Sequence, residues 1–312
     1  IEEAGIHSGD SACAIPPYSL PGETIDRLIE QSKKLAEALR VRGLMNIQYA
    51  ITRPGTVSDR YEIFVLEVNP RASRTVPFVS KATGVSWARI AAKVMAGCKL
   101  ADLDITENYL PDHTSVKESV FPFSKFPGVD VILGPEMRST GECMGADDDW
   151  PLAFAKSQMS AGTQLPTEGN VFLSVRDSDK SHVVDVARQL SDMGFVIYST
   201  GGTRQYLADQ AVEVKALRKI QEGGRPNAID LIKNHELAFI INTPTRKAMR
   251  TDEGKLRATA VRYGVPMITT AAGASAAAQA IAALRHGDWS VKALQDYYPS
   301  YQTGLAPKPT TV

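Results

Sequence analysis

Phe64-Val65-Leu66-Glu67-Val68-Asn69-Pro70-Arg71-Ala72-Ser73-Arg74 is an apolar run that ends in a carboxylate, an amide and two guanidinium groups. Residues two apart in a strand project to the same face, so Glu67 and Asn69 share one face. Leu66 and Val68 are expected to point the other way, into a core. A carboxylate beside an amide oxygen suits Mg²⁺, which takes oxygen ligands and keeps substrate phosphates in its shell. Arg71 and Arg74 follow closely enough to bind phosphate or carboxylate oxygens. The stretch predicts either a strand that carries a metal and phosphate site or a plain core strand with surface arginines.

A second strand precedes this one. Residues 46–51 are apolar with period two, and the turn-rich segment 52–60 contains Pro54-Gly55 before the apolar run resumes at Tyr61. Two strands joined by a tight connection form a hairpin, in which Gln48 faces the same side as Glu67 and Asn69. A lone glutamine in a strand is more often simply solvated. The convergence of three oxygen-bearing side chains nevertheless favours a ligand site.

Composition limits the class of protein. The chain has 312 residues, 43% of them hydrophobic, which predicts two domains, and its formal net charge of zero argues against nucleic acid as the main partner. Cys13, Cys98 and Cys143 have no CxxC spacing, so neither a disulfide framework nor a zinc site is indicated and a reducing cytoplasm fits. We expect no membrane span, because no run of 18 apolar residues occurs. The start at Ile1 favours a piece of a longer chain.

The second half alternates between apolar strands and helices. Residues 162–170 have the composition of a linker, so we expect domains at 1–161 and 171–298 and a flexible tail at 299–312. Continuous apolar strands that alternate with helices predict a parallel sheet covered on both faces, with ligands at the carboxyl ends of its strands. The expected strands are 171–175, 195–200, 211–217, 237–243 and 265–270, and the expected helices are 180–193, a helix from 204, 228–234, one within 246–263 and 272–284.

Hydroxyl-rich residues follow several of these strands. Ser199-Thr200-Gly201-Gly202-Thr203 ends one strand and opens a helix, Asn242-Thr243 ends another and Thr269-Thr270 a third. Each threonine alone is more often a helix cap. Three such strand ends in one sheet, with Lys180 and Lys219 to add charge, favour an anion site.

At this point the chain resembles a known family. Glu67-Val68-Asn69-Pro70-Arg71, the phrase from Val76 to Gly84, Ser115-Val116-Lys117-Glu118 and the phrase from Gly134 to Glu142 are similar to the carbamoyl-phosphate synthetase large subunits, in their second, carbamoyl-phosphate-forming half. The resemblance implies the C-terminal part of an ATP-grasp fold of mixed α/β and α+β class. Biotin carboxylases are less similar, because the Gln-Val-Glu-His run that follows their Glu-x-Asn-x-Arg is absent here.

The resemblance also implies roles for the first half. Arg71 and Arg74 stabilise charge on the transferring phosphoryl group, and ATP is the substrate that donates it. Mg²⁺ or Mn²⁺ is held against the ATP phosphates by Gln48, Glu67 and Asn69, while the nucleotide is contacted by Gly5, Ile6, His7 and Ser8 together with Gln48 and Glu67.

The second half resembles the family's methylglyoxal-synthase-like regulatory domain, a Rossmann-like parallel sheet. Positions that bind the nucleotide effectors UMP, as inhibitor, and IMP, as activator, are matched by Lys180, Thr200, Thr203, Lys219, Asn242 and Thr243. Pro244 departs from a threonine in some members, which leaves the identity of the effector open. Pro244-Thr245-Arg246-Lys247 lacks the catalytic carboxylate of true methylglyoxal synthases, so the domain is interpreted as regulatory.

An ornithine site between the two parts is implied more weakly, with Glu2, Asp10, Glu118 and Thr270 at matching positions. The implied activity is the ATP- and Mg-dependent phosphorylation of carbamate to carbamoyl phosphate. In the full-length enzyme this step completes a synthesis from bicarbonate, glutamine-derived ammonia and two molecules of ATP, in arginine and pyrimidine biosynthesis. The full-length protein works with a glutamine amidotransferase small subunit, and an oligomer is expected. The alternative is an effector-binding module that is catalytically incomplete.

Overall fold

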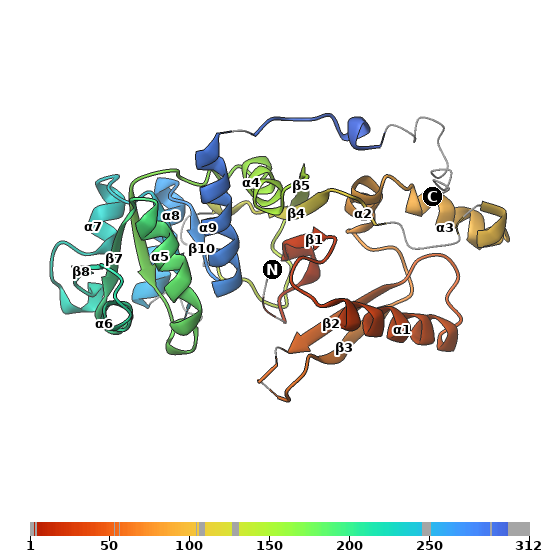
Figure 1. The fold of residues 1–312 in the computed structure, drawn as a ribbon, viewed down its shortest axis with the longest axis horizontal. Coiled ribbons are helices and arrows are strands. Elements are labelled where there is room, and N and C mark those ends of the chain that lie inside the picture. Colours follow the sequence, from red (N-terminus) through yellow and green to blue (C-terminus); the bar gives the residue numbers. More distant parts are fainter. Residues whose placement is uncertain are drawn as a thin grey trace. The chain divides into compact units, whose positions relative to one another are not determined.

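The computed structural model describes residue 3 and residues 5–52, 54–55, 57–103, 105, 110–126, 131–244, 251–287 and 289–298. These residues form two compact units (Figure 1). Unit 1 comprises Ile1–Cys13 and Val116–Trp289, and unit 2 comprises Ala14–Ser115 and Ser290–Val312. The predicted domain boundaries stay predictions, and each unit is described by itself.

Unit 2 contains the predicted hairpin. Strands β2 (Asn46–Thr52) and β3 (Glu62–Asn69) pair antiparallel, as expected. Helix α1 (Gly22–Ala38) is tied to them, because the hydroxyls of Ser32 and Tyr49 lie 2.8 Å apart and Arg27 Nη1 donates to the Tyr61 carbonyl at 2.9 Å. These polar contacts hold the hairpin against the helix.

Two further helices follow the hairpin. The Ala-rich run 87–95, which ends just before Gly97, predicts the observed helix α3 (Trp87–Met95), whereas α2 (Val76–Thr83) was not predicted. Gly84 ends α2 in the left-handed conformation with φ +69°, and a Cβ there would lie 2.8 Å from the Tyr298 ring. Unit 2 also contains the 3₁₀ turns η2 (Leu100–Leu103) and η7 (Leu294–Tyr297), and the Tyr298 hydroxyl lies 3.2 Å from His113 Nε2. The segment 290–298 is therefore anchored on unit 2.

A three-stranded sheet has the order β1-β4-β5, formed by β1 (Cys13–Ile15), β4 (Thr114–Val120) and β5 (Gly141–Asp147). The phrase from Gly134 to Glu142 is dense in glycine and charge and by itself predicts a loop, but its last two residues begin β5. Helix α4 (Trp150–Ser160) packs so closely on β5 that a Cβ on Gly145 would lie 2.3 Å from the Ala153 carbonyl oxygen. A glycine is therefore required at position 145. The 3₁₀ turns η1 (Ser8–Asp10) and η3 (Phe123–Lys125) flank β1 and β4.

The expected parallel sheet is confirmed in unit 1, with strand order β10-β9-β6-β7-β8 and parallel pairing throughout. The strand predicted at 211–217 is shorter in the structure. Ala211 adopts φ +61° in a turn, and the strand begins at Lys215. The strands are β6 (Asn170–Ser174), β7 (Val196–Thr200), β8 (Lys215–Leu217), β9 (Phe239–Asn242) and β10 (Met267–Ile268).

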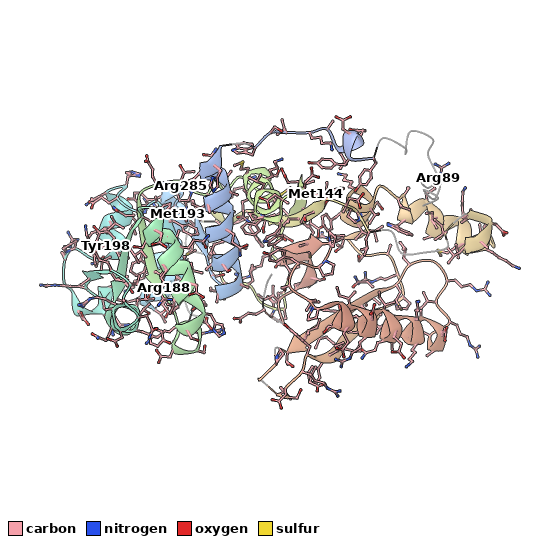
Figure 2. The ribbon with its side chains drawn as sticks, in the orientation of Figure 1. Arg89, Met144, Arg188, Met193, Tyr198 and Arg285 are labelled. Atoms are coloured by element: carbon pink, nitrogen blue, oxygen red, sulfur yellow. The ribbon has the colours of Figure 1, made fainter. Side chains whose placement is uncertain are left out.

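Helices cover both faces of this sheet. Phe172 and Ile240 pack in one buried cluster with Leu231 of α7 and Leu256 of α8, and the alternate residue Leu173 is fully buried on the opposite face. Helices α5 and α9 are neighbours, and Arg285 of α9 donates to the Met193 carbonyl. Both residues are labelled in Figure 2. The helices and turns are η4 (Asp177–Asp179), η5 (Ser181–Val183), α5 (Val184–Asp192), α6 (Gly201–Asp209), η6 (Ile220–Glu222), α7 (Ala228–Lys233), α8 (Asp252–Tyr263) and α9 (Ala271–His286).

A membrane span was not expected from the sequence. Across the part of the chain that the structure describes, every helix is too short or too polar to cross a bilayer.

Candidate functional site

The end of the β2–β3 hairpin brings together the three predicted metal ligands. Gln48 lies directly opposite Glu67, and Asn69 follows two residues later on the same face. Asn69 Nδ2 donates to Glu67 Oε1 at 3.0 Å. The expected convergence of these side chains is confirmed, while their roles as ligands stay predictions.

One expectation about this strand is wrong. Gln48 pairs with Glu67 but Tyr49 pairs with Val65, so Leu66 is an extra residue in a β-bulge of β3. Leu66 was expected to face a core, and its side chain is 48% exposed instead. The bulge bends β3 beside the three polar side chains. Bulges are over-represented next to active sites.

The chemistry of these side chains fits a hard divalent cation. Glu67 is exposed and offers a carboxylate, while the amides of Gln48 and Asn69 offer neutral oxygens. Among the described residues, no group of three His, Cys, Asp or Glu side chains is placed to hold a metal ion. A cation at the hairpin would therefore depend on the two amides, with substrate oxygens or water completing its shell.

The two predicted phosphate-binding arginines lie just beyond β3. Arg71 N–H donates to the Asn69 carbonyl at 2.8 Å, and Arg71 Nη1 donates to the Ala72 carbonyl at 3.0 Å. Arg71 and Arg74 are both exposed. The structure therefore places two accessible guanidinium groups within five residues of Asn69.

The predicted nucleotide-contacting loop lies in unit 1. Gly5 is in the left-handed region with φ +94° and has open space around it, and Ser8 is exposed. His7 N–H donates to the Gly134 carbonyl at 2.8 Å, and the Gly9 N–H donates to His7 Nδ1 at 3.1 Å. Ile6 is partly buried. The structure brings Gly5, Ile6, His7 and Ser8 together in one loop.

A buried ion pair supports this loop, and the sequence analysis did not single it out. Lys117 is 0% exposed; its ammonium lies 3.3 Å from Glu142 Oε1 and 3.4 Å from the Ser8 carbonyl oxygen. The period-two spacing of Ser115, Lys117 and Ser119 along β4 is the signal that points these three side chains to one face.

Two of the predicted effector residues flank the start of α6. A Cβ on Gly202 would lie 3.0 Å from Lys180 Nζ, and a Cβ on Gly201 would lie 3.2 Å from Lys219 Cε. Both ammonium groups therefore approach the helix N-terminus, which already carries a partial positive charge. Lys180 Nζ also pairs with Asp177 Oδ1 at 2.7 Å, and that contact lowers the pKa of the exposed Asp177 carboxyl.

Three other predicted effector residues are bound to the backbone. The Thr203 hydroxyl donates to the Val175 carbonyl at 3.2 Å, and Asn242 Nδ2 donates to the Ser174 carbonyl at 2.9 Å. The Thr243 hydroxyl oxygen accepts from the Arg176 N–H at 3.0 Å. All three side chains are buried. In this structure these contacts tie the carboxyl ends of the strands to one another.

A cavity of about 380 Å³ opens beside these strand ends. Thr200, Lys219 and Asn242 line it, together with Arg218, Thr251 and Asp252. Lys180, Thr203 and Thr243 do not belong to its lining. The structure therefore gathers half of the predicted effector residues around one hollow at the edge of the sheet.

The predicted ornithine residues are not gathered at one place. Glu2 lies outside the described residues, and both carboxylate oxygens of the buried Asp10 accept backbone N–H groups. Glu118 and Thr270 do line one cavity of about 920 Å³, along with Phe121 and Phe123. Glu118 accepts from Gln158 Nε2 and the Ser119 N–H, and the Thr270 hydroxyl caps α9 at Gly273 N–H (3.0 Å).

Cys13 and Cys143 do not favour thiol chemistry. Burial raises the pKa of Cys143 to about 11, and burial also raises the pKa of Cys13. A thiolate is the nucleophilic form, so both side chains stay unreactive at neutral pH.

Two family models match the chain in its two halves. The model described as the ATP-binding domain of the carbamoyl-phosphate synthase L chain matches residues 2–103, and the model described as an MGS-like domain matches residues 182–269. The first match covers the loop at His7 and the hairpin end at Glu67. The second covers the start of α6 and Asn242. An ATP-binding segment is thus followed by an MGS-like domain, as expected.

Curated proteins extend the match to nearly the whole chain. The carbamoyl phosphate synthase large chain of Rhodopirellula baltica is 51% identical over 298 residues, which are 96% of this chain and 27% of that protein. The chain is homologous to a C-terminal part of carbamoyl phosphate synthase large chains. The large chains of Methanothermobacter thermautotrophicus and a Nostoc species are 50% and 48% identical over 96% of this chain. It therefore spans about a quarter of the length of these carbamoyl phosphate synthase large chains.

A solved methylglyoxal synthase from Elizabethkingia anophelis NUHP1 is 21% identical, with a TM-score of 0.31, over 36% of this chain and 77% of that one.

The curated relatives confirm the resemblance to carbamoyl phosphate synthase large chains that the sequence motifs indicated.

Proposed function

We propose that this chain supplies the metal- and phosphate-contacting part of an ATP-dependent site that phosphorylates carbamate to carbamoyl phosphate. The observation that carries the proposal is the hairpin end, where Gln48 faces Glu67 and Asn69 is hydrogen-bonded to the Glu67 carboxylate. Relatives named carbamoyl phosphate synthase large chain support the reaction. Because this chain spans about a quarter of them, the activity belongs to a longer protein.

Gln48, Glu67 and Asn69 would hold the Mg²⁺ or Mn²⁺ ion. When bound, the ion neutralises charge on the ATP phosphates, which is most of what phosphoryl transfer requires besides positioning. Arg71 and Arg74 bring two fork-shaped cations to the same end of β3 and stabilise the negative charge of the transferring group. The loop from Gly5 to Ser8 contributes backbone and side-chain donors to the nucleotide.

The second half acts as the regulatory part of the same protein. Lys180, Lys219 and the start of α6 offer a phosphate subsite, and the neighbouring cavity of about 380 Å³ is suited to the rest of a nucleotide such as UMP or IMP. The 920 Å³ cavity lined by Glu118 is the candidate site for ornithine. The remaining parts of the proposal are a cytoplasmic location, oligomers, an amidotransferase small subunit as partner, and a place in arginine and pyrimidine synthesis.

A second candidate is an effector-binding module without catalysis. The pair of ammonium groups at the start of α6 favours it, because that site lies wholly within unit 1. The proposed metal ligands of the hairpin end belong to unit 2, and the loop at His7 belongs to unit 1.

The two candidates are separated by assaying the chain for carbamate-dependent ADP formation and, in parallel, for UMP binding by calorimetry. Saturable UMP binding without turnover would favour the effector-binding module, because the proposed anion site lies within unit 1. ADP formation that depends on both carbamate and Mg²⁺ would establish catalysis by this chain. Absence of both UMP binding and turnover would contradict both candidates.

A further inference from the structure

Every residue of the turn from His7 to Asp10 forms a hydrogen bond with a distant part of the chain. His7 N–H donates to the Gly134 carbonyl at 2.8 Å, and the Ser8 carbonyl accepts from the Lys117 ammonium at 3.4 Å. The Gly9 carbonyl accepts from the Ser119 and Ser139 hydroxyls, at 2.9 Å each. Two of these four partners, Gly134 and Ser139, belong to the phrase from Gly134 to Glu142, which the proposed function leaves without a role.

Asp10 provides the strongest of these attachments. Its side chain is 1% exposed; Oδ2 accepts the Arg138 N–H at 2.8 Å, and Oδ1 accepts the Ser139 N–H at 2.9 Å. Bonds from N–H groups to a carboxylate are short and roughly twice as strong as neutral ones. Each oxygen therefore accepts one bond from the segment 134–139.

The same turn determines the state of the His7 ring. The Gly9 N–H donates to His7 Nδ1 at 3.1 Å, so Nδ1 keeps its lone pair and the neutral ring carries its proton on Nε2. A Cβ on Gly9 would lie 3.2 Å from His7 Nδ1 and 3.3 Å from Met137 Sδ. The imidazole is thus packed over Gly9 beside a side chain of the segment 134–139, and Nε2–H is its remaining donor.

We propose that Asp10 is a positioning residue: it fastens the His7–Asp10 turn to the segment 134–139 and thereby fixes His7 as an Nε2–H donor to a bound nucleotide. The proposal rests on the proposed function for the identity of the ligand. It gives the phrase from Gly134 to Glu142 a role as the frame of the nucleotide-contacting loop.

The test is Asp10→Asn in this chain, with Asp185→Asn as the matched control. Asparagine keeps one acceptor and turns an NH₂ group toward a backbone N–H donor, so one of the two attachments is lost. Asp185 is 95% exposed and makes a 3.4 Å surface contact with Arg188. Two quantities are measured: the His7 tautomer by ¹⁵N NMR without nucleotide, and the affinity for MgADP by calorimetry.

We expect a single Nε2–H tautomer of His7 in the unaltered chain and mixed tautomers in Asp10→Asn. The Asp10→Asn variant should also bind MgADP about tenfold more weakly, which is the effect of one lost charge-assisted hydrogen bond. Asp185→Asn should match the unaltered chain in both. If Asp10→Asn keeps the tautomer and the MgADP affinity but loses ornithine binding, the positioning role is overturned. If the tautomer responds while the unaltered chain binds no MgADP, the positioning of His7 is supported and the proposed function is contradicted.

Ser139→Ala keeps the test decisive if Asp10→Asn does not fold. It removes the hydroxyl that reaches the Gly9 carbonyl and leaves the Ser139 N–H bond to Asp10 in place. We expect the same direction of change with a smaller size, about threefold in MgADP affinity, because the lost bond is neutral. An unchanged tautomer and affinity in this variant would overturn the proposal.

Discussion

Glu142→Gln is expected to lower the free energy of unfolding by about 3 kcal/mol, because it removes the charge partner of a buried ammonium group. Lys117 is 0% exposed, whereas the Glu142 side chain is 16% exposed, and their charged atoms lie 3.3 Å apart. Without the carboxylate, the ammonium keeps the Ser8 carbonyl and a neutral amide, which do not replace its lost hydration. Urea unfolding followed by circular dichroism measures the loss.

Glu30→Gln is the matched control, because Glu30 forms an exposed pair with Lys34 at 2.6 Å and should show no measurable change. The double replacement Lys117→Met with Glu142→Leu should recover most of the lost stability, since it removes both charges together. A Glu142→Gln variant as stable as the unaltered chain would show that Lys117 is not a buried cation.

Replacing both Lys180 and Lys219 by glutamine is expected to weaken UMP binding about 100-fold, and each single replacement about tenfold. Both ammonium groups approach the first turn of α6, within 3.0 Å of a Cβ built on Gly202 and 3.7 Å of one built on Gly201. There, positive charge without an anion opposes the helix dipole, and a bound phosphate relieves that repulsion. Calorimetric titration with UMP gives the affinities.

Lys215→Gln is the control for this pair, because Lys215 lies over the Tyr198 ring, 5.8 Å from its centre, and not at the start of α6. Added salt should weaken UMP binding more in the unaltered chain than in the double variant, since two fewer charges are screened. Equal UMP affinities in the double variant and the unaltered chain would place the effector phosphate elsewhere.

The sequence predicted the pairing that builds the candidate metal site. Glu67 and Asn69 alternate with apolar residues, and that period of two is enough to assign both side chains to one face of a strand. The partner strand followed from the turn at Pro54-Gly55, which set Gln48 on the same face. The bulge at Leu66 was not predictable, because a shift of one ladder bond leaves no mark in the pattern of residue types.

Two helices escaped prediction for different reasons. The sequence marks both ends of α2, because Pro77 lies in its first turn and Gly84 adopts the left-handed conformation of a C-cap. The eight residues between them show no clear helical period of apolar side chains, so the helix itself was not predicted. Helix α4 carries the apolar Leu152 and Met159 on the side opposite the buried Trp150, so it lacks the polar face that marks an amphipathic helix.

Side-chain partners were the least predictable part of the site. Asp10 reads as a polar loop residue, yet it binds backbone groups about 130 positions later in the chain, a contact that no local pattern encodes. The sequence correctly placed three predicted effector residues at or beside the carboxyl ends of strands. In the structure their hydroxyl and amide groups form hydrogen bonds with backbone atoms, and the residues are Thr203, Asn242 and Thr243. Sequence alone locates such residues but does not show which groups their side chains bind.

The most direct measurement concerns the cation at the hairpin end. Mn²⁺ and ATP are brought to equilibrium with the chain by dialysis, and the Mn²⁺ retained with the protein is measured by electron paramagnetic resonance. Glu67→Gln removes the carboxylate that Gln48 faces, whereas Glu62→Gln removes a carboxylate of the same strand that contacts Ser58 and Arg60. We expect Glu67→Gln to weaken retention at least about tenfold, because a hard cation loses its charged ligand, and Glu62→Gln to leave it unchanged. Retention of Mn²⁺ with ATP by Glu67→Gln as strong as in the unaltered chain would contradict the assignment of the hairpin end as the metal site.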